Sequence, residues 1–317
     1  MMPWVLSGLG LVILLLAGDA LVRGAVNLSL RVGVPALIVS LTIVAFGTSA
    51  PELLIAISAL RDNAPGIALG NVVGSNTANI LLVLGIPAIL STLHTSECNT
   101  RKTYVFMLLA SFLFIGLAMC GVFTVWSGLI LLAGLALVLG DTFCEARAHR
   151  RAGCACDDDL EEIEEADPNM PYWRIGVYLV LGLIGLPLGA DLLVDNATVI
   201  ARTYGISETV IGLTLIAVGT SLPELATTVM AALRRQADVA LGNVIGSNMF
   251  NLLAIIGVAT FFGDIPVDDA FLEFDLWVML GASLMLIPFV FLKKDITKVW
   301  GVALTSLYVV YVMSILH

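Results

Sequence analysis

Two glutamates, Glu52 and Glu224, stand inside long apolar stretches, and each directly follows a proline. A charged side chain at the centre of a membrane helix costs about 2.5–3.5 kcal/mol on insertion scales, so such residues face the bundle interior and serve a function by default. A single membrane glutamate can also be a hydrogen-bond partner between two helices. Two of them in matching contexts favour a functional site.

The prolines before these glutamates, Pro51 and Pro223, predict breaks in the helices that carry them. Proline lacks a backbone N–H, and its ring clashes with the carbonyl four residues earlier. We therefore expect both helices to break at the sequence Gly-Thr-Ser, at 47–49 and 219–221. Carbonyls freed at membrane depth are tolerated only inside protein or beside a cavity. Carboxylate, hydroxyl and carbonyl oxygens together suit a hard cation such as Ca²⁺ or Na⁺.

A second motif, G-N-x-x-G-S-N-x-x-N, supplies further polar groups and occurs twice, at 70–79 and 242–251. Its serine and last asparagine are four residues apart and therefore share a helix face. These residues are Ser75 and Asn79 in the first copy, and Ser247 and Asn251 in the second. The first asparagine of each copy, Asn71 or Asn243, lies one turn further along that face.

The charge of the two glutamates limits which cations the site can bind. If both are ionised they carry −2, which balances one Ca²⁺ or two Na⁺. An empty site would hold two unpaired carboxylates close together in a medium of low dielectric constant, which is unfavourable. The site should therefore change conformation when it is loaded with cations, which is the physical requirement for exchange rather than leak.

Both motifs belong to an internal repeat. Residues 41–85 match residues 213–257 without a gap, at an offset of 172 residues. The matching polar residues are Ser49 with Ser221, Glu52 with Glu224, Asn71 with Asn243, Ser75 with Ser247, Asn79 with Asn251 and, in the preceding helix, Asp19 with Asp191. Five membrane spans separate the copies, so the copies enter the membrane in opposite orientations. Inverted repeats are typical of secondary transporters, which bind substrate near the midplane.

The composition agrees with a polytopic membrane protein. Of 317 residues, 59% are hydrophobic and 13% charged, and the net charge is −10. These values argue against a soluble enzyme, a disordered chain, a disulfide scaffold and a nucleic-acid binder. Charged residues and Pro/Gly positions divide the chain into ten candidate spans of about 20 apolar residues each. They are 4–30, 35–60, 66–93, 103–120, 122–141, 172–200, 207–233, 239–263, 271–292 and 296–316.

The distribution of lysine and arginine predicts the orientation of the chain. Alternate loops hold twelve of these residues against two, and basic residues favour the cytoplasmic side. This places both termini outside the cytoplasm and the long polar loop 142–171 inside it. We expect a first five-helix repeat at 1–141, a cytoplasmic acidic loop at 142–171 and a second, inverted five-helix repeat at 172–317.

Other polar residues favour ordinary roles. Asp19 and Arg23 are four residues apart and predict a structural salt bridge, and Asp191 and Asp195 are also interpreted as structural. The acidic run 157–165 has no EF-hand spacing and is interpreted as a solvated tether. The five cysteines fit no zinc pattern. The histidines His94, His149 and His317 lie in loops or at the terminus, where a role in proton coupling is disfavoured.

At these motifs the sequence resembles the sodium/calcium exchangers of the Ca²⁺:cation antiporter superfamily, in particular the prokaryotic inner-membrane members. G-T-S-x-P-E followed by G-N-x-x-G-S-N, present in both halves, is similar to their two α-repeats. The resemblance implies an all-α polytopic fold of ten transmembrane helices in two inverted repeats, with helices 2 and 7 broken mid-membrane. It also implies four clustered cation sites, and first and sixth helices that slide across the rest.

The resemblance further implies a set of cation ligands. Glu52 and Glu224 would be central, and the other ligands would be Thr48, Ser49, Thr220, Ser221, Ser75, Ser247, Asn79 and Asn251, with the carbonyls of Ala45 and Ala217. One feature departs from the family, because some members carry an aspartate where this chain has Asn79 or Asn251. A third carboxylate is therefore absent here, which leaves the Na⁺:Ca²⁺ ratio open.

The sequence thus predicts an inner-membrane antiporter that exchanges Ca²⁺ for Na⁺ by alternating access and exports Ca²⁺, with no cofactor, no covalent catalysis and no obligate protein partner. The nearest alternative is a Ca²⁺/H⁺ antiporter in which Glu52 and Glu224 carry protons, and some family members use K⁺. A cation channel is disfavoured because paired carboxylates in inverted repeats favour alternating access. A membrane hydrolase is disfavoured because no histidine lies in a predicted span and no H-E-x-x-H motif is present.

Overall fold

The computed structural model describes residues 2–152, 167, 169–205, 217–269 and 271–316. The first half contains α1 (Met2–Val32), α2 (Ala36–Val39), η1 (Ser40–Val44), α3 (Ala45–Thr48), α4 (Ala50–Arg61), α5 (Pro65–Ala78), η2 (Asn79–Val83), α6 (Gly85–Leu90), α7 (Arg101–Ala118), β1 (Val122–Phe123) and α8 (Val125–Ala152). The second half contains α9 (Tyr172–Thr203), α11 (Ala217–Gly219), α12 (Leu222–Leu233), α13 (Ala237–Met249), η5 (Phe250–Ile255), α14 (Ile256–Ala259), β2 (Ile265–Pro266), η6 (Phe271–Asp275), α15 (Leu276–Leu284), α16 (Ile287–Phe291) and α17 (Lys298–Leu316). The protein is an all-α polytopic membrane protein, as the sequence predicts.

Nine helical segments in the described part of the chain are long and apolar enough to cross a membrane. They correspond in order to nine of the ten predicted spans. The remaining span, predicted at 207–233, is represented by the shorter apolar helix α12 together with α11, because its first residues lie outside the described part of the chain. The helix α8 continues to Ala152, past the predicted end of its span at 141.

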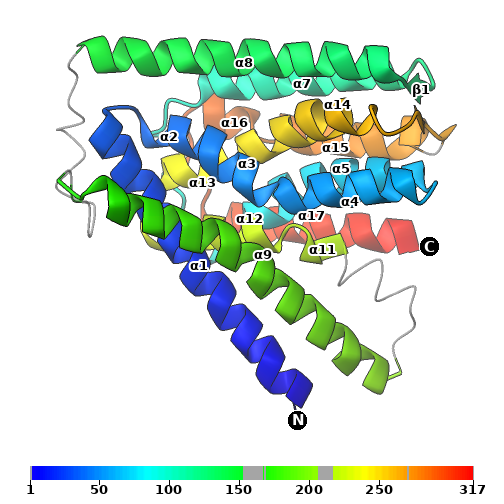
Figure 1. Ribbon diagram of the computed structural model, residues 1–317, viewed down its shortest axis with the longest axis horizontal. Coiled ribbons are helices and arrows are strands. Elements are labelled where there is room, and N and C mark those ends of the chain that lie inside the picture. Colours follow the sequence, from blue (N-terminus) through cyan, green and yellow to red (C-terminus); the bar gives the residue numbers. More distant parts are fainter. Residues whose placement is uncertain (1, 153–166, 168, 206–216, 270, 317) are drawn as a thin grey trace.

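The two long helices α1 and α9 cross side by side, and one half of each extends away from the other helices (Figure 1). Glycines permit this close approach. A Cβ added at Gly10 would lie 2.7 Å from the backbone nitrogen of Leu193, and one at Gly189 would lie 2.8 Å from that of Leu14. Small residues at such crossings let helix backbones meet within a membrane, where packing rather than the hydrophobic effect drives association.

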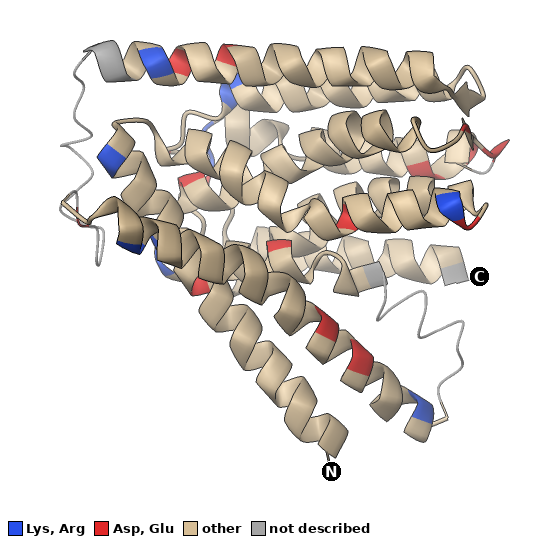
Figure 2. Cartoon of the chain, viewed as in Figure 1, with Lys and Arg blue, Asp and Glu red and all other residues tan. Residues whose placement is uncertain are grey.

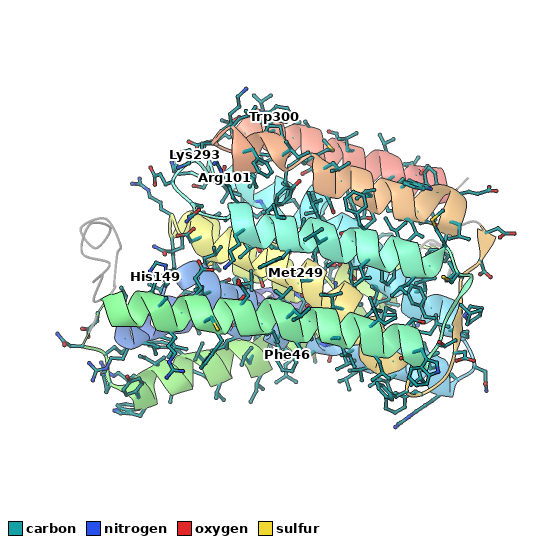
Figure 3. The ribbon with its side chains drawn as sticks, turned by 90° about the horizontal axis from the view of Figure 1, so that it is seen from above. Phe46, Arg101, His149, Met249, Lys293 and Trp300 are labelled. Atoms are coloured by element: carbon teal, nitrogen blue, oxygen red, sulfur yellow. The ribbon has the colours of Figure 1, made fainter. Side chains whose placement is uncertain are left out.

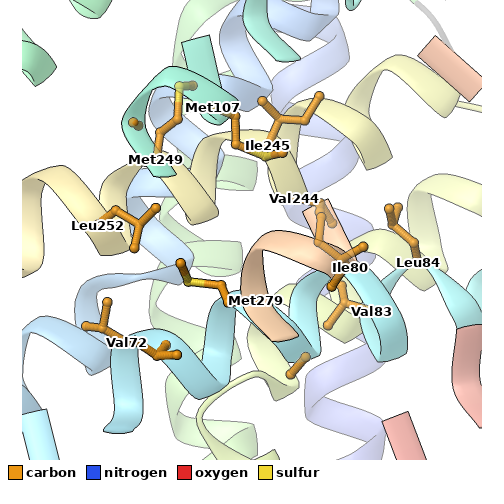
Figure 4. Packing of buried hydrophobic residues seen from close by; sticks show 14 of the residues in the cluster. Val72, Ile80, Val83, Leu84, Met107, Val244, Ile245, Met249, Leu252 and Met279 are labelled. Carbon is orange, nitrogen blue, oxygen red and sulfur yellow. The ribbon is translucent and has the colours of Figure 1, made fainter. Parts of the chain in front are cut away.

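The segments Pro65–Leu90 and Ala237–Ala259, which contain the two G-N-x-x-G-S-N-x-x-N motifs, form the centre of the bundle. In their most apolar windows 83% and 94% of the residues are buried, more than in any other described span. Figure 4 shows Val72 and Ile80 of the first segment packed near Val244 and Leu252 of the second, with methionines from α7 and α15 among them. Both copies of the motif are therefore held inside protein.

The periphery is apolar as well. Large hydrophobic side chains are exposed along α1, α8, α9 and α17, among them Leu137 at 76% and Val310 at 64%, and Figure 3 shows such side chains pointing outward around the bundle. Charged residues gather mainly near the ends of the helices (Figure 2). This distribution is that of a protein surrounded by lipid along its sides and by water at its ends.

Four of the described spans contain π-helical turns that the sequence does not predict. They are η1 in the second span, η2 beginning at Asn79 in the third, η5 beginning at Phe250 in the eighth and η6 at the start of the ninth. A π-turn adds one residue to a helical turn and is frequent at functional sites. In both repeats the turn begins at or next to the last asparagine of the polar motif.

Short antiparallel contacts join loops at the ends of the bundle. Val122–Phe123 pairs with Ile265–Pro266, and Leu93 forms a bridge with Ile296. Each contact links a loop of the first half to a loop of the second.

Candidate cation-binding site

The helix breaks lie where the prolines predict them. Ser49 separates α3 from α4 with φ −87° and ψ 4°, and Ser221 precedes α12 with φ −88° and ψ 3°. Proline occupies the first turn of both following helices, where its missing N–H costs nothing. The two repeats therefore build the same break at matching residues.

Each break places its glutamate in the first turn of a helix. Glu52 is 1% exposed and Glu224 is fully buried, although both are acidic. The N-terminal turn of a helix carries unpaired N–H groups and a partial positive charge, which favour a carboxylate. Ser49, three residues before Glu52, donates to Glu224. The fold thus gathers two acidic residues from opposite halves of the chain in one buried region.

Polar residues of both repeats meet at Glu224. Its Oε1 atom lies 3.4 Å from the hydroxyl of Ser49 and 3.5 Å from the hydroxyl of Ser247, and both hydroxyls donate to it. The hydroxyl of Thr48 lies 3.4 Å from that of Ser247. Residues from the second, seventh and eighth spans therefore share one polar cluster, as the motifs predict.

Asn243 ties this cluster together. Its Oδ1 accepts a hydrogen bond from Thr48 at 3.3 Å, and its Nδ2 donates to the Thr228 hydroxyl at 3.2 Å and to the Glu224 carbonyl at 3.3 Å. Thr228 in turn donates to the same carbonyl at 2.7 Å. The sequence motifs do not single out Thr228. Its position one turn after Glu224, on the same helix face, is the signal that could have found it.

The matching residues around Glu52 are not bonded in the same way. The Ser221 hydroxyl, the Glu52 Oε2 atom and the Asn71 Nδ2 group are buried and have no hydrogen-bond partner among the described residues. Ser75 is buried on α5, and Thr220 is half-buried and makes a polar or electrostatic contact of its own. The described conformation is therefore asymmetric, with the polar cluster assembled at Glu224 and not at Glu52.

Several buried oxygens in this part of the structure lack a partner. In addition to those of Glu52 and Ser221, they include Glu224 Oε2, Asn79 Oδ1 and Asn251 Oδ1. Leaving a buried acceptor unsatisfied costs about 1–3 kcal/mol, and more for a charged group. Carboxylate, amide and hydroxyl oxygens are ligands for hard cations. The donor set therefore fits a hard cation and offers no imidazole or thiolate among the residues just named.

The two alanines behave differently from the side-chain ligands. The carbonyl of Ala45 accepts the Ser49 N–H at 3.0 Å and the Thr48 hydroxyl at 3.3 Å, so it lies within the polar cluster. Ala217 begins α11, and its side chain lies outside the described residues. Its role as a carbonyl ligand stays a prediction.

Other residues that the sequence singles out lie apart from this cluster. Arg23 Nε is 2.8 Å from Asp19, which confirms that predicted salt bridge. Asp191 and Asp195 are exposed on α9. The acidic run 157–165 and two of the cysteines lie outside the described residues, and within the described ranges no three His, Cys, Asp or Glu side chains form a group able to hold a metal.

Asn76 and Asn248 are buried polar residues to which the sequence motifs assign no role. Each is 1% exposed, and each lies between the serine and the last asparagine of its motif. The signal that could have found them is their recurrence at the repeat offset of 172 residues.

Comparison with known proteins places the chain in a family. The family model of the sodium/calcium exchanger protein matches residues 2–140 and 175–316. The putative antiporter CaxA of Alkalimonas amylolytica is 37% identical over 88% of this chain and 86% of its own length. The sodium/calcium exchanger MaX1 of Methanosarcina acetivorans is 32% identical over 98% of this chain and 97% of its own length.

The fold matches as well. A solved structure of the sodium–calcium exchanger NCX_Mj, soaked with Na⁺ and Ca²⁺, superposes with a TM-score of 0.81 at 32% identity, and covers 99% of this chain and 98% of that one. These findings confirm the resemblance seen in the sequence. The chain belongs to the sodium/calcium exchanger family.

Proposed function

We propose that this protein is a secondary antiporter that exchanges Ca²⁺ for Na⁺ by alternating access and exports Ca²⁺ from the cytoplasm. The observation that carries the proposal is the burial of Glu52 and Glu224 in two matching halves of the chain that meet through the bond from Ser49 to Glu224, beside oxygens that have no partner among the described residues. Relatives named as a sodium/calcium exchanger and a putative antiporter support the same activity.

The proposed ligands are the twelve residues that the resemblance implies. Glu52 and Glu224 would neutralise the cation, while the hydroxyls of Thr48, Ser49, Thr220, Ser221, Ser75 and Ser247, the amide oxygens of Asn79 and Asn251, and the carbonyls of Ala45 and Ala217 would replace its water. Ca²⁺ takes six to eight oxygen ligands in flexible geometry, whereas Mg²⁺ demands a small octahedron and keeps several waters. A set this large and varied favours Ca²⁺ over Mg²⁺.

The charge balance explains why transport would be coupled. Two carboxylates match one Ca²⁺ or two Na⁺, so the loaded site is close to neutral with either ion. An empty site leaves negative charge unpaired in the interior, which opposes the conformational change. The protein would therefore change its accessible side mainly when it is loaded, and Ca²⁺ would move one way for Na⁺ moving the other.

We further propose that the protein lies in the inner membrane with both termini outside the cytoplasm. Its two repeats would be residues 1–141 and 172–317, joined by a cytoplasmic acidic loop at 142–171. The bias of lysine and arginine toward alternate loops supports this orientation. A relative from Escherichia coli, 34% identical over 87% of this chain, is named inner membrane protein YrbG. No resident cofactor is expected, because the ions are cargo.

The test is uptake of radioactive Ca²⁺ into proteoliposomes loaded with Na⁺, compared with vesicles loaded with K⁺ and with vesicles under an imposed pH gradient. Glu52→Gln and Glu224→Gln would be measured beside Glu145→Gln, the same change at a partly exposed residue that pairs with Lys102 near the end of α8. Uptake that requires internal Na⁺, is lost in the first two variants and is retained in the third supports the proposal. Uptake driven by the pH gradient without Na⁺ would instead identify a proton antiporter, and flux that neither saturates nor requires a counter-ion would identify a channel.

A further inference from the structure

The amides of Asn76 and Asn248 join the two central helices. Asn76 Nδ2 donates to the backbone carbonyl of Asn248 at 3.3 Å, and Asn248 Nδ2 donates to the backbone carbonyl of Asn76 at 3.3 Å. The two residues are 172 positions apart, so they are equivalent residues of the two repeats. These two bonds make the crossing of α5 and α13 locally two-fold symmetric, and Asn76 Nδ2 additionally lies 3.8 Å from the sulfur of Met279.

Their side-chain carbonyls break that symmetry. Asn248 Oδ1 accepts a hydrogen bond from Asn79 Nδ2 at 3.0 Å. The equivalent bond in the other repeat would run from Asn251 Nδ2 to Asn76 Oδ1. Both of these atoms are buried and have no hydrogen-bond partner in the part of the chain that the structure describes. One amide–amide bond is therefore formed, whereas the equivalent bond is not formed although its donor and acceptor are both present and unbonded.

The bond from Asn79 to Asn248 has a consequence for cation binding. An amide group carries a carbonyl oxygen, which can ligate a cation, and an NH₂ group, which cannot. Because the NH₂ group of Asn79 is bound by Asn248, its oxygen is left as the free end, and that oxygen has no other partner. Groups that orient a ligand from behind tune the affinity of metal sites. Asn248 thus fixes which end of the Asn79 amide stays free to ligate a cation.

The hydrogen bonds of the two glutamates show the same asymmetry between the repeats. Ser49 donates to Glu224, whereas the equivalent Ser221 hydroxyl and the Glu52 Oε2 atom have no partner. In a transporter built from inverted repeats, the opposite conformation is reached when the two repeats exchange their local arrangements. A bond made in one repeat and open in the other is then expected to exchange as well.

We propose, resting on the exchange function argued above, that Asn248 and Asn76 are positioning residues that act in alternation. In the described conformation Asn248 orients Asn79 as a cation ligand. In the opposite conformation Asn76 accepts the amide of Asn251 and orients that ligand instead. In each conformation, the amide oxygen of one repeat only would be oriented to ligate the cation.

The test uses the KM for Ca²⁺ at each membrane face, in proteoliposomes of known orientation. Asn248→Leu and Asn76→Leu remove the acceptor from one repeat each while nearly preserving side-chain volume. We expect each to raise the KM by about tenfold at one face, with the two variants acting at opposite faces. Their reciprocal bonds are equivalent, so the loss of those bonds alone would affect both variants alike. Equal increases at both faces would overturn the proposal.

A double-mutant cycle separates positioning from a structural role. If Asn248 acts through Asn79, adding Asn248→Leu to Asn79→Ala produces no further rise in KM, whereas adding it to Asn251→Ala multiplies the two effects. A further rise in the Asn79→Ala background would contradict the proposal. Asn248→Ala is measured in parallel, so the cycle stays informative if the leucine variant does not fold. Absence of Ca²⁺ transport by the unmodified protein would overturn the proposed function itself, which these variants do not probe.

Discussion

Asp19 Oδ1 lies 2.5 Å from Arg234 Nε, although the two residues are 215 positions apart, and Asp19 Oδ2 also binds Arg23 at 2.8 Å. This ion pair joins the crossing helix α1 to the end of α12, the helix whose first turn carries Glu224. Both side chains are about one-fifth exposed, at 19% for Asp19 and 20% for Arg234. α1 is therefore held by charge to one of the two broken helices.

The matching residues of the other repeat cannot form the same contact. The residues equivalent to Asp19, Arg23 and Arg234 are Asp191, Asp195 and Asp62 at the offset of 172, and all three are acidic. The side chain of Leu54 on α4 is 68% exposed, whereas the equivalent Ala226 on α12 is 7% exposed. Figure 2 shows acidic bands on the half of α9 that extends away from the bundle. Under the alternating access proposed above, the ion pair would therefore favour the described conformation over the opposite one.

Removing this ion pair should shift the balance between the two conformations. An ion pair of this exposure contributes about 1 kcal/mol, which corresponds to about a fivefold change in an equilibrium constant. We expect Arg234→Gln to change the ratio of the KM values for Ca²⁺ at the two membrane faces by about that factor. The matched control is Arg235→Gln, which removes the same charge from the exposed neighbouring residue. An unchanged ratio in Arg234→Gln would show that the pair does not hold the conformation.

Substitution of the two serines at the helix breaks should have different effects on stability, although the surrounding sequences and backbone conformations match. Ser49 donates to Glu224, while the Ser221 hydroxyl has no partner. Loss of one such bond costs about 1 kcal/mol, which for a protein of this size lowers the melting temperature by about 2–4 °C. We expect Ser49→Ala to lower the melting temperature of the ion-free protein and Ser221→Ala to leave it nearly unchanged, while both raise the KM for Ca²⁺. Equal melting temperatures for the two variants would contradict the asymmetry.

Much of the architecture could be predicted because it depends on local chemistry. Pro51 and Pro223 remove backbone donors, so the breaks at Ser49 and Ser221 follow from the sequence. The repeat offset pairs the polar residues without any structure. The long apolar segments fix the spans, because each must bury its backbone groups internally to cross lipid.

The asymmetry between the repeats could not be predicted. The repeats are nearly identical in sequence around Ser49 and Ser221. The local sequence therefore does not indicate that only one of these serines bonds to a glutamate. The contact of Asp19 with Arg234 depends on how α1 packs against α12, which is a tertiary relationship. The π-turns at Asn79 and Phe250 also escape prediction, because the apolar residues that follow them suit an α-helix equally well.

Asp295, in the loop before α17, should make stability depend on pH. Burial alone would raise the pKa of this carboxyl, but hydrogen bonds from the Ser96 backbone N–H and from His94, each at 3.0 Å, outweigh burial and lower it below its ordinary value of 3.8. A carboxyl with a lowered pKa adds stability above its unfolded pKa and loses it as the pH falls through its folded pKa. We expect Asp295→Asn to lower the melting temperature at pH 7, with a difference that shrinks below about pH 4. Glu97→Gln, an exposed residue in the partner loop, is the control, and a pH-independent difference would refute the assignment.

Cation binding should stabilise the protein against heat, because buried oxygens such as Glu52 Oε2 and Asn79 Oδ1 have no partner among the residues that the structure describes. A ligand that binds only the folded state at 100 times its dissociation constant adds about 2.7 kcal/mol, which corresponds to a rise of about 5–11 °C in melting temperature. We expect Ca²⁺ to produce such a rise and Mg²⁺ to produce little, since Mg²⁺ demands octahedral geometry and dehydrates reluctantly. Glu52→Gln should abolish the Ca²⁺ effect, while Glu145→Gln should retain it. An equal rise with both ions, or one that survives in Glu52→Gln, would locate the stabilising cation away from the glutamates.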